Sequence, residues 1–142
     1  MSRENVELVR AALGASSKFD MLALFTGDEA PPSLDLSVFV EDLEVVFVPA
    51  LDPGRVKGLE GLVDSWREWL VAWRRYDAEV EELIDAGEDV LVLVRLRGET
   101  KHDGVVIEQR AAVVYTLEAG KVVRLAFHLD RRTALAEVRP AD

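Results

Sequence analysis

Cysteine is absent from the 142 residues, and histidine occurs only at His102 and His128. The first absence excludes disulfides, thiolate metal sites and cysteine nucleophiles. With two histidines and no HxH or HExxH spacing, we expect no metal centre and no bound cofactor. No apolar run approaches the roughly 20 residues that a membrane span requires, and the N-terminus has no apolar signal segment. We therefore expect a cytoplasmic protein without a membrane partner.

Positive charge is also scarce, because 17 basic residues stand against 27 acidic ones, for a formal net charge of −10. Proteins that bind nucleic acid need a basic surface for the phosphate backbone, so we expect no nucleic-acid partner. The acidic residues between Asp77 and Asp89 are typical of a solvated edge. Hydrophobic residues make up 49% of the chain, enough for a packed core. The length suits one domain over residues 1–142.

Helical periodicity is clearest in two segments. Val6, Val9, Ala12 and Leu13 predict a helix that starts at Ser2 and ends before Gly14. The second segment follows Gly58, and its apolar residues fall at i, i+4, i+7, i+8 and i+11: Leu62, Trp66, Trp69, Leu70 and Trp73. This spacing predicts a helix with all three tryptophans on one face. Three indoles expose too much apolar area for water, so we expect that face to pack against a broad sheet.

The remaining segments predict mostly strands. A weaker helical pattern from Ser17 to Gly27 precedes the break at Pro31-Pro32, and we make no prediction for most of residues 27–42. Leu43–Val48 predicts a strand, and four antiparallel strands follow from Tyr76. Their turns contain Gly87, Asp103-Gly104 and Gly120. A last helix is expected from Asp130 through Val138.

Turn geometry predicts which residues face each other across the hairpins. A three-residue loop before Lys121 pairs Tyr115 with Val123 and places His128 opposite Arg110. A two-residue turn at Asp103-Gly104 pairs Leu96 with Ala111 and puts Arg97 opposite Arg110. The sheet then has one apolar face and one face that mixes arginine with apolar residues.

The two faces predict different roles. The apolar face should meet the tryptophan helix and form a ligand pocket, with these lining residues: Phe47, Trp66, Trp69, Trp73, Val94, Leu96, Gln109, Ala111, Val113, Leu125 and Phe127. The mixed face is typical of solvent exposure or of a subunit interface. As an interface it would form a homodimer through Leu93, Arg95, Arg110, Ala112, Val114, Arg124, Ala126 and His128.

Four short segments carry a resemblance to a known family: Glu41-Asp42-Leu43-Glu44, Leu59-Glu60-Gly61, Asp85-Ala86-Gly87, and Leu117–Val123 running on to Leu129-Asp130-Arg131. In their order and spacing the chain resembles the SnoaL-like branch of the nuclear transport factor 2-like superfamily, over nearly all of residues 6–138. The resemblance implies an α+β cone, in which a bent antiparallel or mixed sheet wraps N-terminal helices and the tryptophan helix, with a short C-terminal helix. It also implies a pocket at the open end and pairing through the convex face.

Enzymes of this superfamily include polyketide cyclases, ketosteroid isomerases and epoxide hydrolases, and the resemblance implies a carboxylate or histidine in the pocket. The predicted register instead gives apolar residues there. Asp130 is the best-placed carboxylate, although its position favours capping of the last helix over a catalytic role. Tyr76 and Tyr115 could orient a ligand or act as acid–base partners of Asp130. Three hypotheses remain open: a binding domain for a small, mostly apolar, cyclic molecule; an isomerase, cyclase or hydrolase; and a homodimer in which any cavity is a by-product of the fold.

Overall fold

The structure is a computed structural model that describes residues 2–13, 18–22, 39–48 and 56–137. Its helices lie at the start, in the middle and at the end of the described chain, and its strands between them. The elements are α1 (Ser2–Leu13), β1 (Lys18–Asp20), β2 (Phe39–Val48), β3 (Val56–Lys57), α3 (Gly58–Leu70), β4 (Trp73–Ala86), β5 (Asp89–Thr100), β6 (Val106–Glu118), β7 (Lys121–His128) and α4 (Arg131–Glu137).

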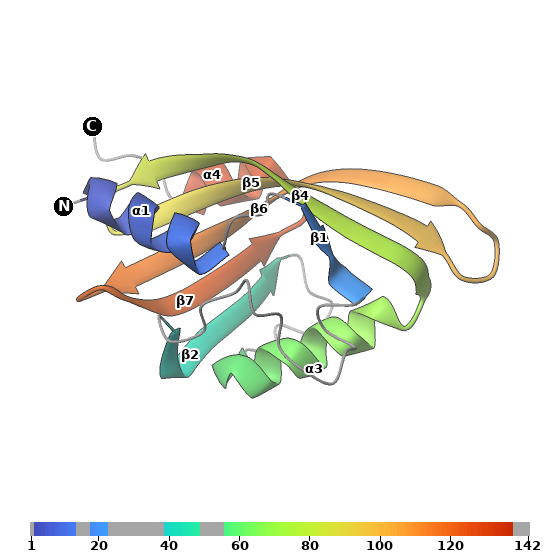
Figure 1. Ribbon diagram of the computed structural model, residues 1–142, viewed down its shortest axis with the longest axis horizontal. Coiled ribbons are helices and arrows are strands. Elements are labelled where there is room, and N and C mark those ends of the chain that lie inside the picture. The colour runs from blue at the N-terminus through green and yellow to red at the C-terminus, as the bar shows by residue number, and fades with distance from the viewer. Residues whose placement is uncertain (1, 14–17, 23–38, 49–55, 138–142) are drawn as a thin grey trace.

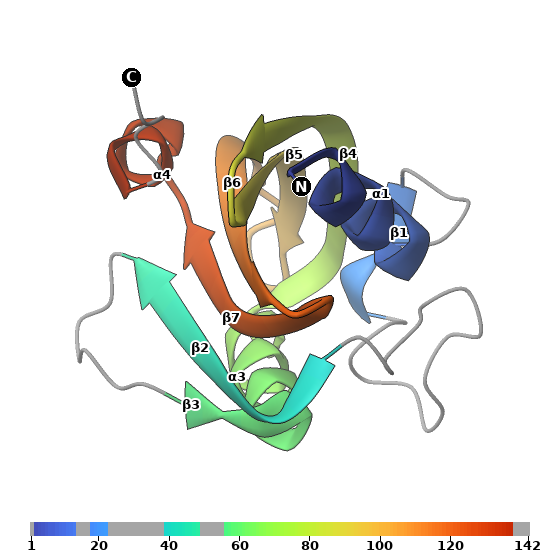
Figure 2. The same ribbon diagram turned by 90° about the vertical axis from the view of Figure 1, so that its left-hand side faces the viewer.

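All the described strands belong to one sheet in the order β1-β4-β5-β6-β7-β2-β3. Strands β4 to β7 are joined by hairpins and pair antiparallel, as their turn residues predict, whereas β2 pairs parallel to β7. The sheet is therefore mixed. Figure 2 shows how it curls from β4 through β7 to β2, with α3 on its concave side and α4 outside it. This arrangement confirms the predicted α+β cone.

The curl has an identifiable local cause. Register shifts interrupt the ladders between Trp73 and Arg75, between Val80 and Glu82, and within β2 and the β6–β7 hairpin. A bulge adds one residue to one strand of a pair, which bends that strand and increases its twist. Long strands with such interruptions wrap around a helix instead of forming a flat sheet. Figure 1 shows β4, β5 and β6 bending in this way above α3.

Each face of the sheet carries its own apolar cluster. The inner cluster joins the inward side chains of β2 and β4–β7 to α1 and α3, and it includes Val9, Leu43, Leu70, Val92 and Leu125. The outer cluster is smaller and lies beneath α4: Leu91, Ala112, Val114, Ala126 and Ala134. Because successive strand residues point to opposite faces, residues 111, 113 and 115 face inward and residues 112 and 114 outward. The predicted division of the sheet into two faces agrees with this arrangement.

The predicted pairings across both hairpins, however, are wrong by two residues. Tyr115 pairs with Leu125, not Val123, and Leu96 pairs with Gln109, not Ala111. At the β6–β7 turn the loop has two residues, Ala119 and Gly120, whose φ angles of 50° and 77° are both left-handed. A non-glycine residue in that region is uncommon, so the sequence favoured a longer loop. An error of two residues leaves every side chain on its predicted face.

The correct register also changes the charge pairs on the outer face. Arg97 lies opposite Glu108 instead of Arg110, and Arg110 lies opposite Arg95. The loop between β5 and β6 is longer than predicted, because the Thr100 N–H donates to the Val105 carbonyl and residues 101–104 form the turn. His128 pairs with Ala112, not Arg110.

Two helix predictions also need correction. Residues 18–20, expected in a helix, form β1 and pair with residues 77–79 of β4. Helix α3 ends at Leu70, so Trp73 is not on the helix but is the first residue of β4. Its ring still lies beside Trp69, because the turn at residues 71–72 is short. The helices predicted at residues 2–13 and after Gly58 are confirmed.

Gly98 makes room for the Trp73 ring against the sheet. A Cβ atom at Gly98 would lie 2.5 Å from Cε3 and Cζ3 of Trp73 and 2.9 Å from Cδ2 of Tyr76. Real Cβ atoms do not approach other atoms so closely, so any larger residue displaces one of these rings. The glycine thus fixes where the aromatic side chains meet the sheet.

We predict that Gly98→Ala lowers the free energy of unfolding by about 1–3 kcal/mol through overpacking. In a Trp73→Ala background the penalty should shrink, because the main obstacle has been removed. Urea unfolding of the four variants of this double-mutant cycle measures the coupling. Arg97→Ala, on the exposed neighbour, is the control and should change stability by less than about 0.5 kcal/mol. An equal penalty with and without Trp73 would contradict the account.

Candidate functional site

A row of aromatic rings runs from the core of the protein to its surface. Phe127 of β7 contacts Trp66 of α3 edge to face, with ring centroids 5.5 Å apart, and Trp66 contacts Tyr76 of β4 at 6.1 Å. Tyr76 in turn meets Trp73 at 5.0 Å and Trp69 at 6.5 Å. Edge-to-face pairs at these distances are favourable beyond the area they bury. We call these five residues the aromatic row.

The outer end of the aromatic row is open to solvent. Trp69 is 46% exposed, whereas Tyr76 beside it is only 4% exposed. Burial raises the pKa of the Tyr76 hydroxyl, and a hydrogen bond with Trp69 acts in the opposite direction. An indole left half in water next to buried rings is a large apolar surface without a complete cover.

The predicted pocket residues of the sheet lie where their alternation placed them. Val94, Leu96, Ala111, Val113 and Leu125 are all buried in the inner cluster. Two of the predicted residues, Gln109 and Phe47, are not part of this buried set. Gln109 is exposed, and its side-chain amide donates to the Leu129 carbonyl. The backbone of Phe47 pairs with Phe127, while its side chain lies outside the described part of the structure.

Tyr115 is the second tyrosine of the inner cluster. It is 8% exposed and sits in one cross-strand row with Val90, Leu125 and Val45. Burial raises the pKa of its hydroxyl to about 12. The group is therefore protonated at neutral pH and can donate a hydrogen bond but not act as a general base. Tyr76 and Tyr115 are the only titratable residues that the inner cluster contains among the described residues.

Asp130 caps α4, which was the structural alternative to a catalytic role. Its Oδ1 atom accepts the Arg132 N–H at 2.9 Å, and its carbonyl accepts the Thr133 hydroxyl at 2.8 Å. The residue is exposed, and α4 packs on the outer face of the sheet. The structure does not bring Asp130 together with Tyr76 or Tyr115, so we assign it no catalytic role.

Arg131 anchors α4 across the outer face. Its guanidinium donates to the carbonyls of Ala111 and Val94, at 3.1 and 3.0 Å, and forms an ion pair with Glu81 of β4. The hydrogen bond from Arg131 lowers the pKa of the Glu81 carboxyl. One side chain thus connects three strands to the last helix, a role that the sequence did not suggest.

The predicted dimer face is partly covered within the chain itself. Ala112, Val114 and Ala126 are buried in the outer cluster, and His128 is 3% exposed with Nδ1 2.8 Å from the Thr133 hydroxyl. Side chains already shielded from solvent add no buried area when a partner arrives. The other four, Leu93, Arg95, Arg110 and Arg124, remain at least partly exposed. The face-to-face dimer stays a prediction.

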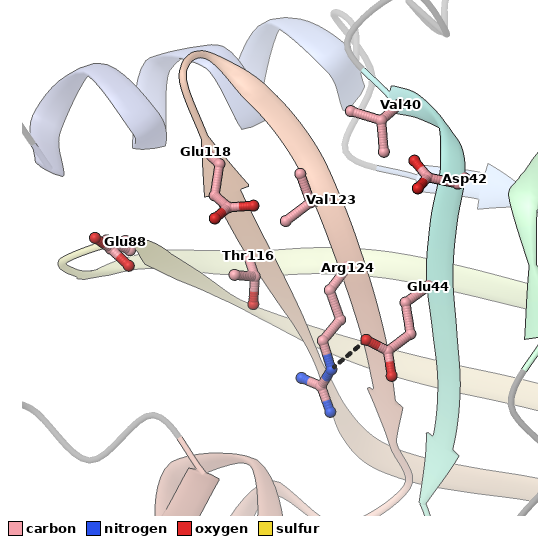
Figure 3. A pocket seen from close by; sticks show the side chains of 8 residues that line it. All are labelled: Val40, Asp42, Glu44, Glu88, Thr116, Glu118, Val123 and Arg124. Carbon is pink, nitrogen blue, oxygen red and sulfur yellow. Dashed lines mark ion pairs between the residues drawn. The ribbon is translucent and has the colours of Figure 1, made fainter.

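An open groove lies on the outer face beside the β6–β7 hairpin (Figure 3). Its volume is about 570 Å³, and its lining comes from β2, β6, β7 and the β4–β5 turn: Val40, Asp42, Glu44, Glu88, Thr116, Glu118, Val123 and Arg124. Figure 3 shows Arg124 in its middle, paired with Glu44 at 3.8 Å. Four carboxylates around one guanidinium suit neither an apolar molecule nor an anion. We therefore do not assign the predicted apolar ligand to this groove.

The described residues contain neither a metal-binding cluster nor a membrane-spanning helix. Within the described residues, no group of three or more histidine, aspartate or glutamate side chains is arranged to hold a metal ion. In the same part of the chain, no helix combines the length and the apolar character needed to cross a membrane.

Sequence reasoning missed the residues whose roles depend on pairing. Gly98 shows no signal by itself, because its importance comes from Trp73 on the neighbouring strand. The outer groove exists because β2 lies parallel to β7, which brings Glu44 beside Arg124. The alternation Asp42-Leu43-Glu44 is a signal that could have placed Asp42 and Glu44 together on the outer face.

Comparison with known proteins supplies a family and a fold. Residues 35–125 match the SnoaL-like domain family. The sequence matches no curated protein. Solved structures with a similar fold include a SnoaL-like protein from Jannaschia sp. CCS1, with a TM-score of 0.67 and 18% identity, covering 99% of this chain and 95% of that one.

Two other solved structures were determined with small molecules. TerC, co-crystallised with polyporic acid, has a TM-score of 0.63 and 19% identity, covering 95% of this chain and 97% of its own. A protein with a ketosteroid isomerase-like fold from Catenulispora acidiphila DSM 44928, in complex with trimethylamine, has a TM-score of 0.61 and 15% identity, covering 95% and 94%. At these identities the likeness shows the fold alone.

The raised pKa of Tyr115 predicts a loss of stability at alkaline pH. A tyrosine in the unfolded chain releases its proton near pH 10, whereas the folded protein retains it to about pH 12. The stabilisation is therefore complete below about pH 10, and stability falls by up to about 1.4 kcal/mol per pH unit between these values. Tyr115→Phe should remove the share of this slope that Tyr115 contributes and leave the share of Tyr76, and urea unfolding from pH 9 to 12 measures the difference. Parallel curves for the two proteins would show that the buried hydroxyl is not the cause.

Proposed function

The chain belongs to the SnoaL-like domain family, and we propose that it binds a small, mostly apolar, cyclic molecule against the aromatic row. The observation that carries this proposal is the exposure of Trp69, which is 46% exposed although it contacts Trp73 and the buried Tyr76. A flat ring system placed on this indole would continue a series of contacts that already runs to Phe127. The bound molecule would shield from solvent the part of the Trp69 ring that the described residues leave exposed.

The chemistry around the row favours a neutral ligand. Among the described residues the only buried polar or charged side chain other than the tyrosines is His128, which lies on the outer face beside Thr133, so a charge on the ligand would find no buried counter-charge on the inner face. The tyrosine hydroxyls can each satisfy one oxygen of a ligand. A rigid ring system also loses little conformational freedom on binding, and aromatic contacts contribute about 0.5–1.5 kcal/mol each beyond buried area.

One known structure of the same fold supports the binding of an organic molecule without deciding the ligand here. TerC was crystallised with polyporic acid, and it shares this fold at 19% identity. We extend only the general property to this chain, namely that the fold accommodates an organic molecule. Polyporic acid is a useful probe for the same reason.

Binding fits the described residues better than acid–base catalysis. The carboxylate proposed from the sequence, Asp130, caps α4 on the outer side of the sheet. The titratable groups left in the inner cluster are Tyr76 and Tyr115, and burial raises the pKa of both. Protonated phenols are suited to hold a ligand oxygen in place and are poorly suited to remove a proton at neutral pH.

The test is a titration of tryptophan fluorescence with steroids, terpenes, aromatic polyketides and polyporic acid. We expect at least one class to give a saturable change, and we expect Trp69→Ala to weaken that binding about tenfold, since a stacked ring is worth on the order of 1 kcal/mol. Trp69→Phe keeps a ring and should retain most of the affinity. Leu135→Ala, which removes an exposed apolar residue from α4, is the matched control and should bind normally.

Two results would contradict the proposal. One is that no compound in the panel changes the fluorescence or the melting temperature of the wild-type protein. The other is that a ligand binds and Leu135→Ala weakens it as much as Trp69→Ala does.

A further inference from the structure

The inner face of β6 becomes exposed toward the β5–β6 hairpin. On this face Ala111 and Val113 are 3% and 8% exposed, whereas Ile107 is 45% exposed and Gln109 is exposed as well. The four residues share the face because they are an even number of positions apart in a ladder with β5 that has no register shift. The last pair between β6 and β7 is at Ala112, and Figure 1 shows the hairpin extending beyond β7. Two inward residues of β6 are therefore open to solvent.

Gly98 brings the aromatic row onto β5 beside Ile107. The Trp73 ring lies where a Cβ atom of Gly98 would stand, since that atom would be 2.5 Å from Cε3 and Cζ3. Ile107 is directly opposite Gly98 in the ladder. The Cβ positions of opposite residues lie about 4.5–5.5 Å apart, so the Ile107 side chain stands beside the Trp73 ring. Trp69 contacts the same ring at 6.0 Å, and thus Trp73 has two half-exposed neighbours.

A polar group with a fixed orientation adjoins this apolar surface. Gln109 follows Ile107 on the inner face, and its Nε2 donates to the Leu129 carbonyl at 2.5 Å. Because the amide nitrogen is held there, the amide oxygen Oε1 is directed away from Leu129. No hydrogen bond to this oxygen is present within the described residues. An amide oxygen is an acceptor, so it can receive a hydroxyl or an N–H.

We propose that the ligand of the aromatic row covers Trp69 and Ile107 together and donates a hydrogen bond from an uncharged group, a hydroxyl or an amide N–H, to Oε1 of Gln109. This inference rests on the proposed function and narrows the class of ligand. It also adds Ile107 to the pocket residues predicted from the sequence. A molecule lying over Gln109 displaces water from the amide oxygen. A donor on the ligand replaces that water, whereas a hydrocarbon or an ether leaves the oxygen without a partner.

The residues around Gln109 favour a neutral donor over an ammonium group. Its inward neighbours on β6 are Ile107 and Ala111, and the residues opposite on β5 are Leu96 and Gly98. None of these side chains carries a charge. An ammonium group placed against them would lose its hydration without gaining an ion pair, which is costly, whereas a hydroxyl loses less. The amide oxygen thus selects for a donor but not for a cation.

Two neighbouring substitutions on β6 test the contact with the hairpin. Ile107 and Val106 are 45% and 48% exposed, but they point to opposite faces of the sheet. We expect Ile107→Ala to raise the Kd of 2-naphthol about fivefold, because apolar area that the ligand covers is removed, and Val106→Ala to change it less than about twofold. Isothermal titration calorimetry measures both values. Equal effects, or no effect of Ile107→Ala, would overturn the inference.

A pair of probes tests the hydrogen bond to Gln109. 2-Naphthol and 2-methoxynaphthalene share a ring system, but only the first can donate. We expect the wild-type protein to bind 2-naphthol about fivefold more tightly. Gln109→Met keeps the length of the side chain without the acceptor, and it should abolish this preference. Glu108→Met, on the outer face, is the matched control and should retain it.

A purely structural role of Gln109 predicts a different result. Gln109→Met would then weaken the binding of both probes equally and leave their affinity ratio unchanged. That outcome, or the absence of a preference in the wild-type protein, would overturn the proposed hydrogen bond. Circular dichroism checks that each variant is folded.

The inference can fail while the proposed function stands. If Trp69→Ala weakens binding of 2-naphthol and neither Ile107→Ala nor Gln109→Met does, the aromatic row binds the ligand and only the inference is wrong. If 2-naphthol does not bind the wild-type protein, the inference is also wrong. The titration with steroids, terpenes and aromatic polyketides then still decides the proposed function.

Discussion

The rest of the structure depends on the contacts that Trp66 makes with two strands on opposite sides of the curled sheet. Its indole packs edge to face against Tyr76 near the start of β4 and against Phe127 near the end of β7. These strands are separated in the sheet by β5 and β6, so one ring links the two sides of the curve. The sheet must bend far enough for both contacts to form, and the bulges in β4 allow it to do so.

This constraint also decides where ligand chemistry can occur. The inner face is used by the core except at its open end, where the aromatic row reaches solvent at Trp69. Charged residues lie on the outer face, in the groove around Arg124 and at Glu108 and Arg110 of β6. The ligand that we propose for the aromatic row is accordingly neutral and apolar, whereas the side chains exposed on the outer face are mostly charged.

Much of this plan could be predicted from the sequence, because it rests on periodicities. Alternation along β5, β6 and β7 assigned Val94, Val113 and Leu125 to the inner face, and helical spacing placed Leu62 and Trp66 on one side of α3. Residues that either pattern assigns to a face keep that assignment when the predicted pairing contains a small error. The hairpin register was wrong by two residues, and the faces remained right because the side-chain period of a strand is two.

What could not be predicted depends on partners distant in the chain. Ala119 adopts a left-handed conformation that sequence statistics disfavour, so the short turn was missed. The end of α3 before Trp73 was missed because the indole spacing continued a helical pattern into β4. The parallel pairing of β2 with β7, the bulges and the reach of Arg131 from α4 to Glu81 all join segments that no local pattern connects.

The central claim is that the solvent-exposed end of the aromatic row receives an apolar ligand. Fluorine NMR of protein labelled with 5-fluorotryptophan tests it most directly, because the chain has three tryptophans and Trp→Phe variants assign each signal. The account predicts that a bound steroid or polyketide shifts the signals of Trp69 and Trp73 in a saturable manner. Unchanged indole signals, while a parallel 1H–15N spectrum shows amide shifts confined to Glu44 and Arg124 in the outer groove, would contradict it.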